Sequence, residues 1–404
     1  MASRGFSKTL YLRHQNSAPR VEFLSPERLG SRVHINLLCH PCGPHRRPLG
    51  GKLKKIFRLV AVVAATTLAV TAFVAPSATA AKSNVKVGLA YDIGGRGDKS
   101  FNDSAAAGLD AAKKKFGVSA KEVTVTTGSD SERTDKLRLL AAAGYNPIIA
   151  VGFLYAGPIK AVASDYPNTS FGIIDDSSVD LLNVAGLVFA EEQGSYLAGV
   201  AAALASKSGK IGYIGGVRIP LLQKFEAGFV AGVKATKKSA SVDVKYVTEF
   251  PDFSGFNDPA KAKVIAKGMI DKGTDVIYSA AGGSGAGNFA AATDAAAAGK
   301  KVWTIGVDSD QYLTASDAEK KNMLTSMIKR VDRAVYDVIA TAVVGSSVND
   351  VLDAKAGIYG RQYNLALDGV GVSYSGGYIT KYKAQIDKAA AAIKSGKIKV
   401  PTKP

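Results

Sequence analysis

From residue 85 onward the chain alternates short runs of β-branched and aliphatic residues with longer, Ala-rich amphipathic segments. The short runs predict strands and the longer segments predict helices. The predicted strands are residues 85–91, 122–127, 147–151, 170–175, 210–214, 242–248, 275–279, 301–307 and 323–328. The predicted helices are residues 102–116, 130–144, 157–165, 191–207, 221–236, 259–273, 286–298 and 330–344, with a further Lys/Ala helix after residue 380.

This alternation predicts an α/β protein. Strands that alternate with helices over about 250 residues form parallel sheets with right-handed crossovers. The strands are too many for one small sheet, so we predict two doubly wound parallel-sheet lobes joined by a hinge. The N-terminal lobe is predicted over residues 84–190 and 309–345, and the C-terminal lobe over residues 191–308 and 346–404.

The ends of the predicted strands carry polar chemistry. In doubly wound sheets, ligands bind beyond the carboxyl ends of the strands. Three of these ends carry an aspartate, namely Asp92, Asp175 and Asp308, and a fourth runs into a glycine turn at residues 282–285. An ionised carboxylate only accepts hydrogen bonds, so the pattern predicts a ligand with hydroxyl and N–H donors.

Histidine and cysteine are confined to the first 45 of the 404 residues. The chain has four His and two Cys, which are His14, His34, His40, His45, Cys39 and Cys42. The body of the protein therefore lacks the residues for a His-based triad, a thiol nucleophile, a disulfide or an ordinary zinc site. We predict no metal, no cofactor and no catalytic residue.

Residues 52–81 are typical of an export signal. A basic start precedes an apolar stretch over residues 59–75, and Ala78-Thr79-Ala80 fits a signal cleavage site. The alternative is an uncleaved membrane anchor, because residues 56–75 are about long enough to span a bilayer, although Arg58 interrupts them. No Cys lies near the cleavage site, so a lipid cannot be attached there.

Residues 1–51 do not resemble a signal peptide, and we interpret them as an atypical leader with a mis-assigned start. Translation would then begin near Val33 or Leu49. A metal knuckle built from the His and Cys of this segment is disfavoured, because no periodic strand or helix surrounds them. The leader also inflates the net charge: residues 1–80 hold 12 Lys or Arg and 2 Asp or Glu, so the formal charge of +18 falls to about +8 for the remainder. The Lys residues of the chain after this leader are typical of solvated helix faces, and we predict no nucleic-acid partner.

The loop after the first strand, residues 92–102, is rich in glycine. A phosphate cradle is disfavoured: Asp98 stands where a Walker motif needs Gly, Ser100 stands where a dinucleotide motif needs Gly, and the carboxylates repel phosphate. Calcium is disfavoured too, because Gly94 replaces the second carboxylate of an Asp-x-Asp site and Tyr312 occupies a ligand position after Asp308. A loop that only caps the following helix remains an alternative.

The same loop resembles the D-x-G-x-x-x-D-x-S-F-N signature of the basic membrane protein family. Its members are nucleoside-binding solute receptors of ABC transporters with the type I periplasmic binding fold. The likeness continues in order through the motifs that begin at Phe171, Phe189, Phe256, Ala281, Ile305 and Thr325. It covers about residues 85–375. Two departures are the missing lipidated Cys and Ala262, which stands where a Gly is frequent.

The resemblance implies a set of ligand-binding residues. Phe101 and Phe256 would sandwich the nucleobase, and Asp92, Asn102 and Asp175 would bond its edge. The ribose would be held by Gly285, Asp308 and Lys329. None of these side chains normally titrates between about pH 6 and 8, so we expect nearly constant affinity across that range.

The resemblance implies an exported, monomeric receptor that binds nucleosides, with purine nucleosides favoured, and delivers them to an ABC permease. The protein would meet the membrane only through the permease or an uncleaved leader. A secreted or tethered nucleoside sensor remains an alternative that the sequence does not separate from transport. A nucleoside-processing enzyme is the more remote alternative, because it would need a metal or an activated base.

Overall fold

The computed structural model describes residues 83–348, 358 and 360–404. The atypical leader at residues 1–51 and the predicted signal peptide at residues 52–81 lie outside the described residues. Within the described ranges, no helix has both the length and the apolar character that a membrane crossing requires.

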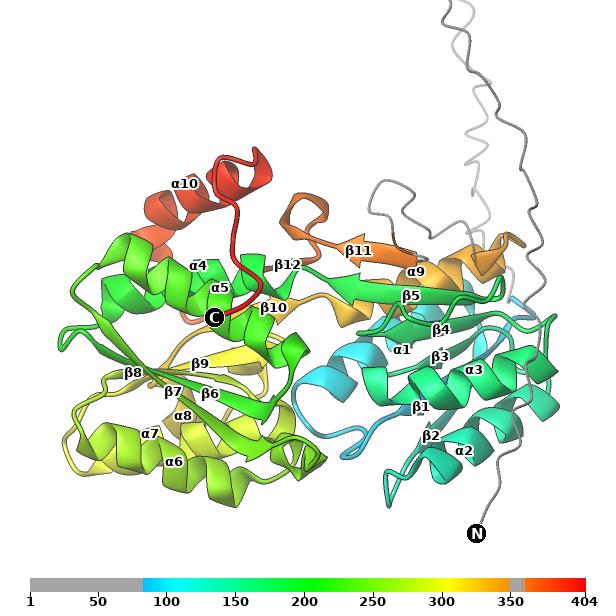
Figure 1. Ribbon diagram of the computed structural model, residues 1–404, viewed down its shortest axis with the longest axis horizontal. Coiled ribbons are helices and arrows are strands. Elements are labelled where there is room, and N and C mark those ends of the chain that lie inside the picture. Colours follow the sequence, from blue (N-terminus) through cyan, green and yellow to red (C-terminus); the bar gives the residue numbers. More distant parts are fainter. Residues whose placement is uncertain (1–82, 349–357, 359) are drawn as a thin grey trace, which may run out of the picture. The chain divides into compact units, whose positions relative to one another are not determined.

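Two six-stranded sheets organise the described part of the chain (Figure 1). The first, sheet A, has the order β11-β5-β4-β3-β1-β2, and all its neighbouring strands run parallel. Its strands are β1 (Lys86–Tyr91), β2 (Ser119–Thr124), β3 (Ile148–Ala150), β4 (Phe171–Ile174), β5 (Val184–Phe189) and β11 (Gly360–Tyr363). Strands β3 and β4 are buried throughout, because helices cover both faces of the sheet.

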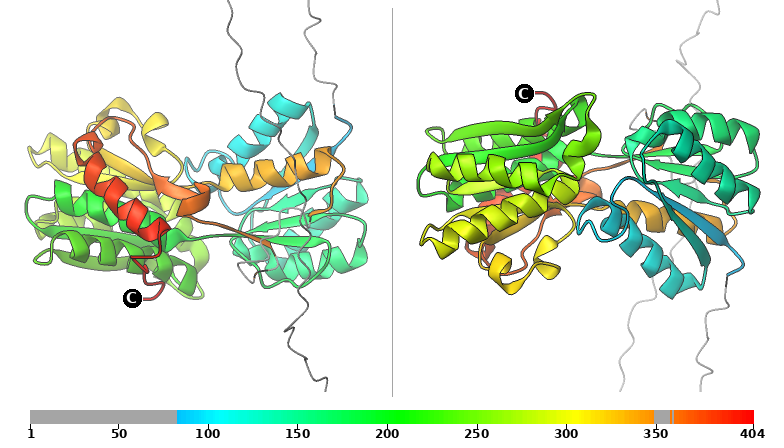
Figure 2. Two further views of the ribbon diagram at one scale, coloured as in Figure 1. Left: turned by 90° about the horizontal axis from the view of Figure 1, so that it is seen from above. Right: turned by 90° about the horizontal axis from the view of Figure 1, so that it is seen from below.

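The helices around sheet A form two pairs. Helix α1 (Phe101–Phe116) packs against α9 (Val331–Val343) on one face, and α2 (Asp130–Ala142) packs against α3 (Ala156–Asp165) on the other (Figure 2). A short 3-10 helix, η1 (Phe153–Tyr155), precedes α3. Helix α9 therefore returns to sheet A although the strand before it belongs to the second sheet.

The second sheet, sheet B, has the order β12-β10-β9-β8-β6-β7. Its strands are β6 (Lys210–Arg218), β7 (Ser241–Glu249), β8 (Val276–Ala280), β9 (Trp303–Asp308), β10 (Met323–Lys329) and β12 (Val370–Val372). All neighbours are parallel except the edge pair β10 and β12, which is antiparallel. The sheet is thus parallel except at this one edge.

Sheet B also carries a helix pair on each face. Helix α4 (Glu191–Ala205) packs against α5 (Pro220–Thr236), and α6 (Pro259–Asp271) packs against α7 (Gly285–Ala297). The first pair lies close together because α5 has glycine at the contact: a Cβ on Gly228 would lie 2.1 Å from the carbonyl oxygen of Glu192. Further elements lie outside these pairs, namely the 3-10 helix η2 (Phe253–Phe256), the short α8 (Asp317–Lys320) and α10 (Lys383–Lys394).

The predicted fold class is confirmed, and each predicted strand and helix overlaps an observed one. Strands β5, β11 and β12 were missing from the prediction. Strand pairing corrects two lobe boundaries. Strand β10 lies within residues 309–345, predicted for the first lobe, but it pairs with β9 in sheet B. Strand β11 lies within residues 346–404, predicted for the second lobe, but it pairs with β5 in sheet A.

Candidate functional site

One pocket lies where the strands of both sheets end. It encloses about 850 Å³ of empty space, part of it open to solvent. Residues in the loops that follow β1, β3 and β4 of sheet A line it together with the last residues of β8, β9 and β10 of sheet B. This is the position that the strand-end rule predicts for both sheets.

Seven of the eight residues proposed from the sequence line this pocket, namely Asp92, Phe101, Asn102, Asp175, Phe256, Asp308 and Lys329. Gly285 is the exception. It is the first residue of α7 and is buried, whereas Gly282 and Gly283 of the same turn line the pocket. The part of the glycine turn that lines the pocket is therefore Gly282 and Gly283, and the prediction placed it at Gly285.

The loop between β1 and α1 is organised by Asp98. Its carboxylate accepts hydrogen bonds from the backbone N–H groups of Ser100 (2.9 Å), Asn102 (2.8 Å) and Asp103 (3.0 Å). Burial raises the pKa of Asp98 above its ordinary value, and these N–H groups oppose the increase. The carboxylate satisfies N–H groups at the start of α1, so the loop does cap the helix while it also lines the pocket.

Asn102 is 3% exposed, and its amide group is already engaged within this loop. Its Oδ1 accepts from the backbone N–H of Asp92 (3.3 Å), and its Nδ2 donates to the Ile93 carbonyl (3.3 Å) and to Asp98 Oδ2 (3.1 Å). In this conformation Asn102 holds the loop closed. A contact between its amide and a nucleobase stays a prediction.

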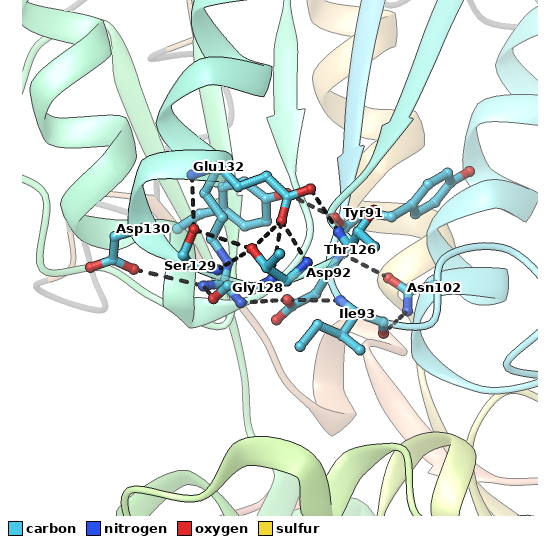
Figure 3. A network of polar contacts seen from close by, with 12 residues as sticks. Tyr91, Asp92, Ile93, Asn102, Thr126, Gly128, Ser129, Asp130 and Glu132 are labelled. Carbon is cyan, nitrogen blue, oxygen red and sulfur yellow. Dashed lines mark hydrogen bonds and ion pairs between the residues drawn. The ribbon is translucent and has the colours of Figure 1, made fainter.

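Asp92 presents one carboxylate oxygen to the protein and leaves the other free (Figure 3). Oδ1 accepts from the Ile93 N–H (2.8 Å) and from Nη2 of Arg133 (2.7 Å). Oδ2 has no hydrogen-bond partner among the described residues and lies beside Gly152, where an added Cβ would be 3.1 Å from it. Asp92 therefore offers a free acceptor at the pocket wall.

Lys329 is the buried cation of the pocket, with a side chain that is 2% exposed. Its Nζ lies 2.6 Å from Oδ2 of Asp175 and 3.7 Å from Oε1 of Glu191. Burial disfavours the ammonium form, but the carboxylates of Asp175, Glu191 and Asp308 outweigh it and raise the pKa of Lys329. The Nζ also lies 5.0 Å from the ring centre of Phe101, within cation–π range.

Asp308, the last residue of β9 in sheet B, is hydrogen-bonded to the loop between β1 and α1. Its Oδ2 accepts a hydrogen bond from the hydroxyl of Ser100 (2.7 Å), and the hydroxyl of Ser309 donates to the Ser100 carbonyl (2.9 Å). Burial raises the pKa of Asp308 to about 6, with Lys329 and Ser100 opposing the increase. This value differs from the sequence-based expectation that no site residue titrates near pH 6.

Two of the strand-end aspartates have left-handed backbone. Asp175 has a φ of 69° and Asp308 a φ of 65°, a region that residues with a Cβ rarely adopt. Asp tolerates this conformation better than most residues because of its short polar side chain. Such backbone is found at binding sites, where it directs a side chain away from the course of the strand.

Aromatic rings form much of the remaining wall, contributed by Phe101, Phe153, Phe225, Phe253 and Phe256. The rings of Phe153 and Phe253 meet edge to face, with centres 5.8 Å apart. The ring of Phe256 packs over Gly216 of β6, where an added Cβ would be 2.5 Å from a ring carbon. The pocket thus combines flat apolar surfaces with carboxylate acceptors.

Several lining residues were not proposed from the sequence. Phe153 and Gly152 follow β3, so the strand-end rule contained the signal for them. Asn257 directly follows Phe256 in the motif that begins there, so the sequence contained a signal for it as well. Phe225 lies inside α5, where nothing in the sequence distinguishes it from a core residue. Within the described part of the chain, no three His, Cys, Asp or Glu side chains are placed to hold a metal ion.

Comparisons with known proteins agree on one group. A family model described as "ABC transporter substrate-binding protein PnrA-like" matches residues 85–401. A Listeria monocytogenes protein named "CD4+ T-cell-stimulating antigen" is 37% identical over 333 residues, 79% of this chain and 88% of that protein. A Lactococcus lactis protein named "ABC transporter nucleoside-binding protein BmpA" is 34% identical over 334 residues, 80% of this chain and 90% of that protein.

A solved structure agrees with these sequence matches. An ABC transporter solute-binding protein from Aeropyrum pernix K1 has a TM-score of 0.67 and 28% sequence identity, and the match covers 79% of this chain and 93% of that one. The fold of this chain is therefore that of solute-binding proteins with two α/β lobes.

Proposed function

The chain belongs to the PnrA-like family of ABC transporter substrate-binding proteins, and on that premise we propose that it binds a purine nucleoside in the pocket and delivers it to an ABC permease. The observation that carries the proposal is the composition of the pocket wall, which pairs phenyl rings with carboxylates at strand ends. A nucleoside presents the complementary groups: a flat base, N–H donors on its edge and ribose hydroxyls.

The base would lie between Phe101 and Phe256. Each of these rings lines the pocket, one from the start of α1 and one from the end of η2. Stacking of a base on an aromatic ring contributes about 1–3 kcal/mol per base, and it tolerates different bases because each has a π-face. The rings would thus supply affinity, and the polar groups would supply selectivity.

The polar edge of the base would face Asp92, whose Oδ2 has no hydrogen-bond partner within the part of the chain that the structure describes, and the ribose would face Asp308 and Lys329. A carboxylate accepts hydrogen bonds from N–H and O–H groups, and Lys329 can donate to a ribose oxygen. A ligand that leaves one of these buried groups unpaired loses about 1–3 kcal/mol.

Nucleoside 5′-phosphates would bind poorly. Four carboxylates line the pocket, those of Asp92, Asp98, Asp175 and Asp308, whereas Lys329 is the lining cation and is already paired with Asp175. A phosphate would add about two negative charges next to these groups. The pocket therefore favours a neutral ligand.

Delivery to a permease would require that the protein act outside the cytoplasm, in keeping with the signal-like residues 52–81. The two sheets would close on the ligand by a hinge motion at the chain crossings between them. Deletion of the protein should then abolish uptake of labelled nucleoside, whereas a sensor would leave uptake intact. We infer no chemical step, and incubation with inosine should release no free base.

Calorimetry with a ligand panel tests the proposal directly. The panel comprises purine and pyrimidine nucleosides, their free bases, their 5′-phosphates, and representative sugars and amino acids. Purine nucleosides should bind best, free bases more weakly, and 5′-phosphates very weakly or not at all. Tight binding of a sugar or an amino acid, with no binding of nucleosides, would refute the proposal.

A further inference from the structure

Arg133 of α2 is a buried cation behind the pocket wall. The residue is 1% exposed, and it does not line the pocket. Its Nη2 lies 2.7 Å from Oδ1 of Asp92, its Nη1 donates to the carbonyl of Gly128, and its guanidinium lies 5.5 Å from the ring centre of Tyr155. Asp92 is thus the pocket-lining residue to which the guanidinium is hydrogen-bonded.

The surroundings of Arg133 fix its guanidinium in place. Glu132 accepts hydrogen bonds from the backbone N–H groups of Thr126 (2.7 Å), Thr127 (2.7 Å) and Gly128 (3.1 Å), which closes the turn before α2 (Figure 3). Gly128 has a φ of 68°, and an added Cβ would lie 2.5 Å from the side chain of Ile93, so this turn requires glycine. The carbonyl that Arg133 meets is thus held by its neighbours.

Tyr155 supports the arginine from the other side. Its hydroxyl donates to the carbonyl of Tyr91, the last residue of β1, at 2.7 Å. The ring is fully buried, so it has little freedom to move away from the guanidinium. Arg133 therefore lies between a fixed carbonyl, a fixed ring and the carboxylate of Asp92.

This arrangement determines which oxygen of Asp92 the ligand meets. Oδ1 accepts from both Arg133 and the Ile93 N–H, so its acceptor capacity is taken by the protein. Oδ2 remains available beside Gly152. Without the arginine, the carboxylate would lose a charge-assisted hydrogen bond and a buried counter-charge, and it could rotate about its own side-chain bonds.

We propose that Arg133 is a positioning residue that sets the selectivity of the pocket for bases with an N–H donor, because it orients Asp92 so that Oδ2 faces the ligand. The proposal rests on the proposed nucleoside function. It assigns Arg133 no contact with the ligand. The effect of losing Arg133 should therefore depend on the base and on the presence of Asp92.

The test compares ligands with and without a donor at the base edge. Inosine and adenosine carry an N–H group there, whereas purine riboside has neither the ring N–H nor the exocyclic amine. Arg133→Met should weaken binding of whichever of inosine and adenosine the wild type prefers by about tenfold or more, and binding of purine riboside much less. In the Asp92→Asn background, Arg133→Met should add little further loss.

Matched variants separate positioning from stability. Arg138 lies on the same helix, and its Nη2 is 2.8 Å from Oδ2 of Asp165 in an exposed pair. Arg138→Met should leave all affinities unchanged. Arg133→Lys keeps the charge but not the planar fork, so it should restore part of the selectivity, and it carries the test if Arg133→Met does not fold.

The outcomes that contradict the inference are distinct from a failure of the proposed function. Equal losses for all three nucleosides, additive with Asp92→Asn, would mean that Arg133 acts only on stability. If no nucleoside binds to the wild type, the proposed function fails. The amide resonance of Ile93 in an NMR spectrum still reports on Oδ1 of Asp92, because the Ile93 N–H donates to the same oxygen as Arg133. An unchanged Ile93 resonance in Arg133→Met would then overturn the inference without any ligand.

Discussion

Nζ of Lys329 lies 2.6 Å from Oδ2 of Asp175, although the strands that position the two residues belong to different sheets. Lys329 ends β10 of sheet B, and Asp175 directly follows β4 of sheet A. Their side chains are 2% and 5% exposed. Two charges that are removed from water depend on each other, so loss of either one leaves the other buried without compensation.

We therefore expect Lys329→Met to lower the free energy of unfolding by about 3–5 kcal/mol. Asp175, Glu191 and Asp308 would lose their common cation, and their carboxylates would remain buried. The double variant Lys329→Met/Asp175→Asn should be more stable than the sum of the single effects indicates, because it removes both charges. Denaturant titration followed by circular dichroism measures these energies.

An exposed pair provides the control for this prediction. Nζ of Lys267 lies 2.9 Å from Oδ2 of Asp271, but these side chains are 70% and 54% exposed. Lys267→Met should change stability far less than Lys329→Met, since solvent screens such pairs. Similar costs for Lys267→Met and Lys329→Met would show that burial gives the pair at Lys329 no special weight.

The aromatic walls predict a second set of variants. Phe101→Ala and Phe256→Ala should each weaken purine nucleoside binding by about 1–3 kcal/mol, or roughly 5- to 150-fold in Kd, because each removes one stacking face. Isothermal titration calorimetry on the purified variants measures the change. Circular dichroism should show the wild-type secondary structure, so that the loss can be assigned to the pocket.

Phe250→Ala is the matched control for the aromatic variants. Phe250 is 67% exposed, lies outside the pocket lining, and touches Phe253 edge to face with ring centres 6.0 Å apart. Its removal should leave Kd within about twofold, the effect of an ordinary surface change. An equal loss of affinity in all three variants would point to a general disturbance of the fold and would count against stacking.

The pKa of Asp308 predicts a pH dependence of both affinity and stability. Its value is raised to about 6, mainly by burial, whereas an unfolded chain would titrate near about 3.9. The folded state therefore holds the proton of Asp308 more tightly than the unfolded state does. The contribution of Asp308 to the free energy of unfolding falls as the pH rises from about 4 to about 6. Conversely, the carboxylate is the better acceptor for ribose hydroxyls, so nucleoside affinity should fall below about pH 6.

Asp308→Asn isolates this effect. The variant should lose the part of the stability change between about pH 4 and pH 6 that Asp308 contributes, because no carboxyl group remains to titrate. Its nucleoside affinity should be weaker than that of the wild type at pH 7.5 and should vary less between pH 5 and pH 7.5. Identical pH profiles of affinity for the two proteins would mean that Asp308 does not titrate in the site.

Most of the fold could be predicted from the sequence because the hydrophobic patterns of strands and helices are local. Short β-branched runs and Ala-rich amphipathic segments located the predicted elements, and the strand-end rule brought Asp92, Asp175 and Asp308 to one pocket. The segment β11 did not show a strand pattern, because Gly360–Tyr363 contains two interior polar residues and only its first and last residues are buried. Its pairing with β5, for example Gly360 with Gly186, joins segments that lie far apart in the chain.

The pocket was less predictable than the fold where a residue acts through its neighbours. Nothing around Arg133 in the sequence distinguishes it from a surface arginine of α2, because its partner Asp92 lies 41 positions away. The engaged amide of Asn102 and the raised pKa of Asp308 also result from contacts that only the folded chain creates. Residue types at strand ends can be read from the sequence, whereas their hydrogen bonds and protonation cannot.

Gly152→Ala tests whether the space beside Asp92 belongs to the ligand. Gly152 has a φ of 119°, and an added Cβ would lie 3.1 Å from Oδ2 of Asp92 and 3.7 Å from the ring of Phe101. The methyl group would crowd the free acceptor and the stacking ring, so nucleoside binding should weaken by about tenfold or more. Calorimetry measures this loss, and thermal unfolding measures the accompanying backbone strain of about 1–3 kcal/mol.

Gly299→Ala separates the two effects of that substitution. Gly299 also has positive φ, 78°, but an added Cβ would meet no atom within 4 Å, and the residue lies outside the pocket lining. This variant should lose less stability than Gly152→Ala, because Gly152, with a φ of 119° and a ψ of 148°, lies in a region that glycine alone readily adopts, and its Kd for nucleosides should stay unchanged. If Gly152→Ala binds as tightly as Gly299→Ala, the ligand does not occupy the space next to Oδ2 of Asp92, and the base edge must be bonded elsewhere in the pocket.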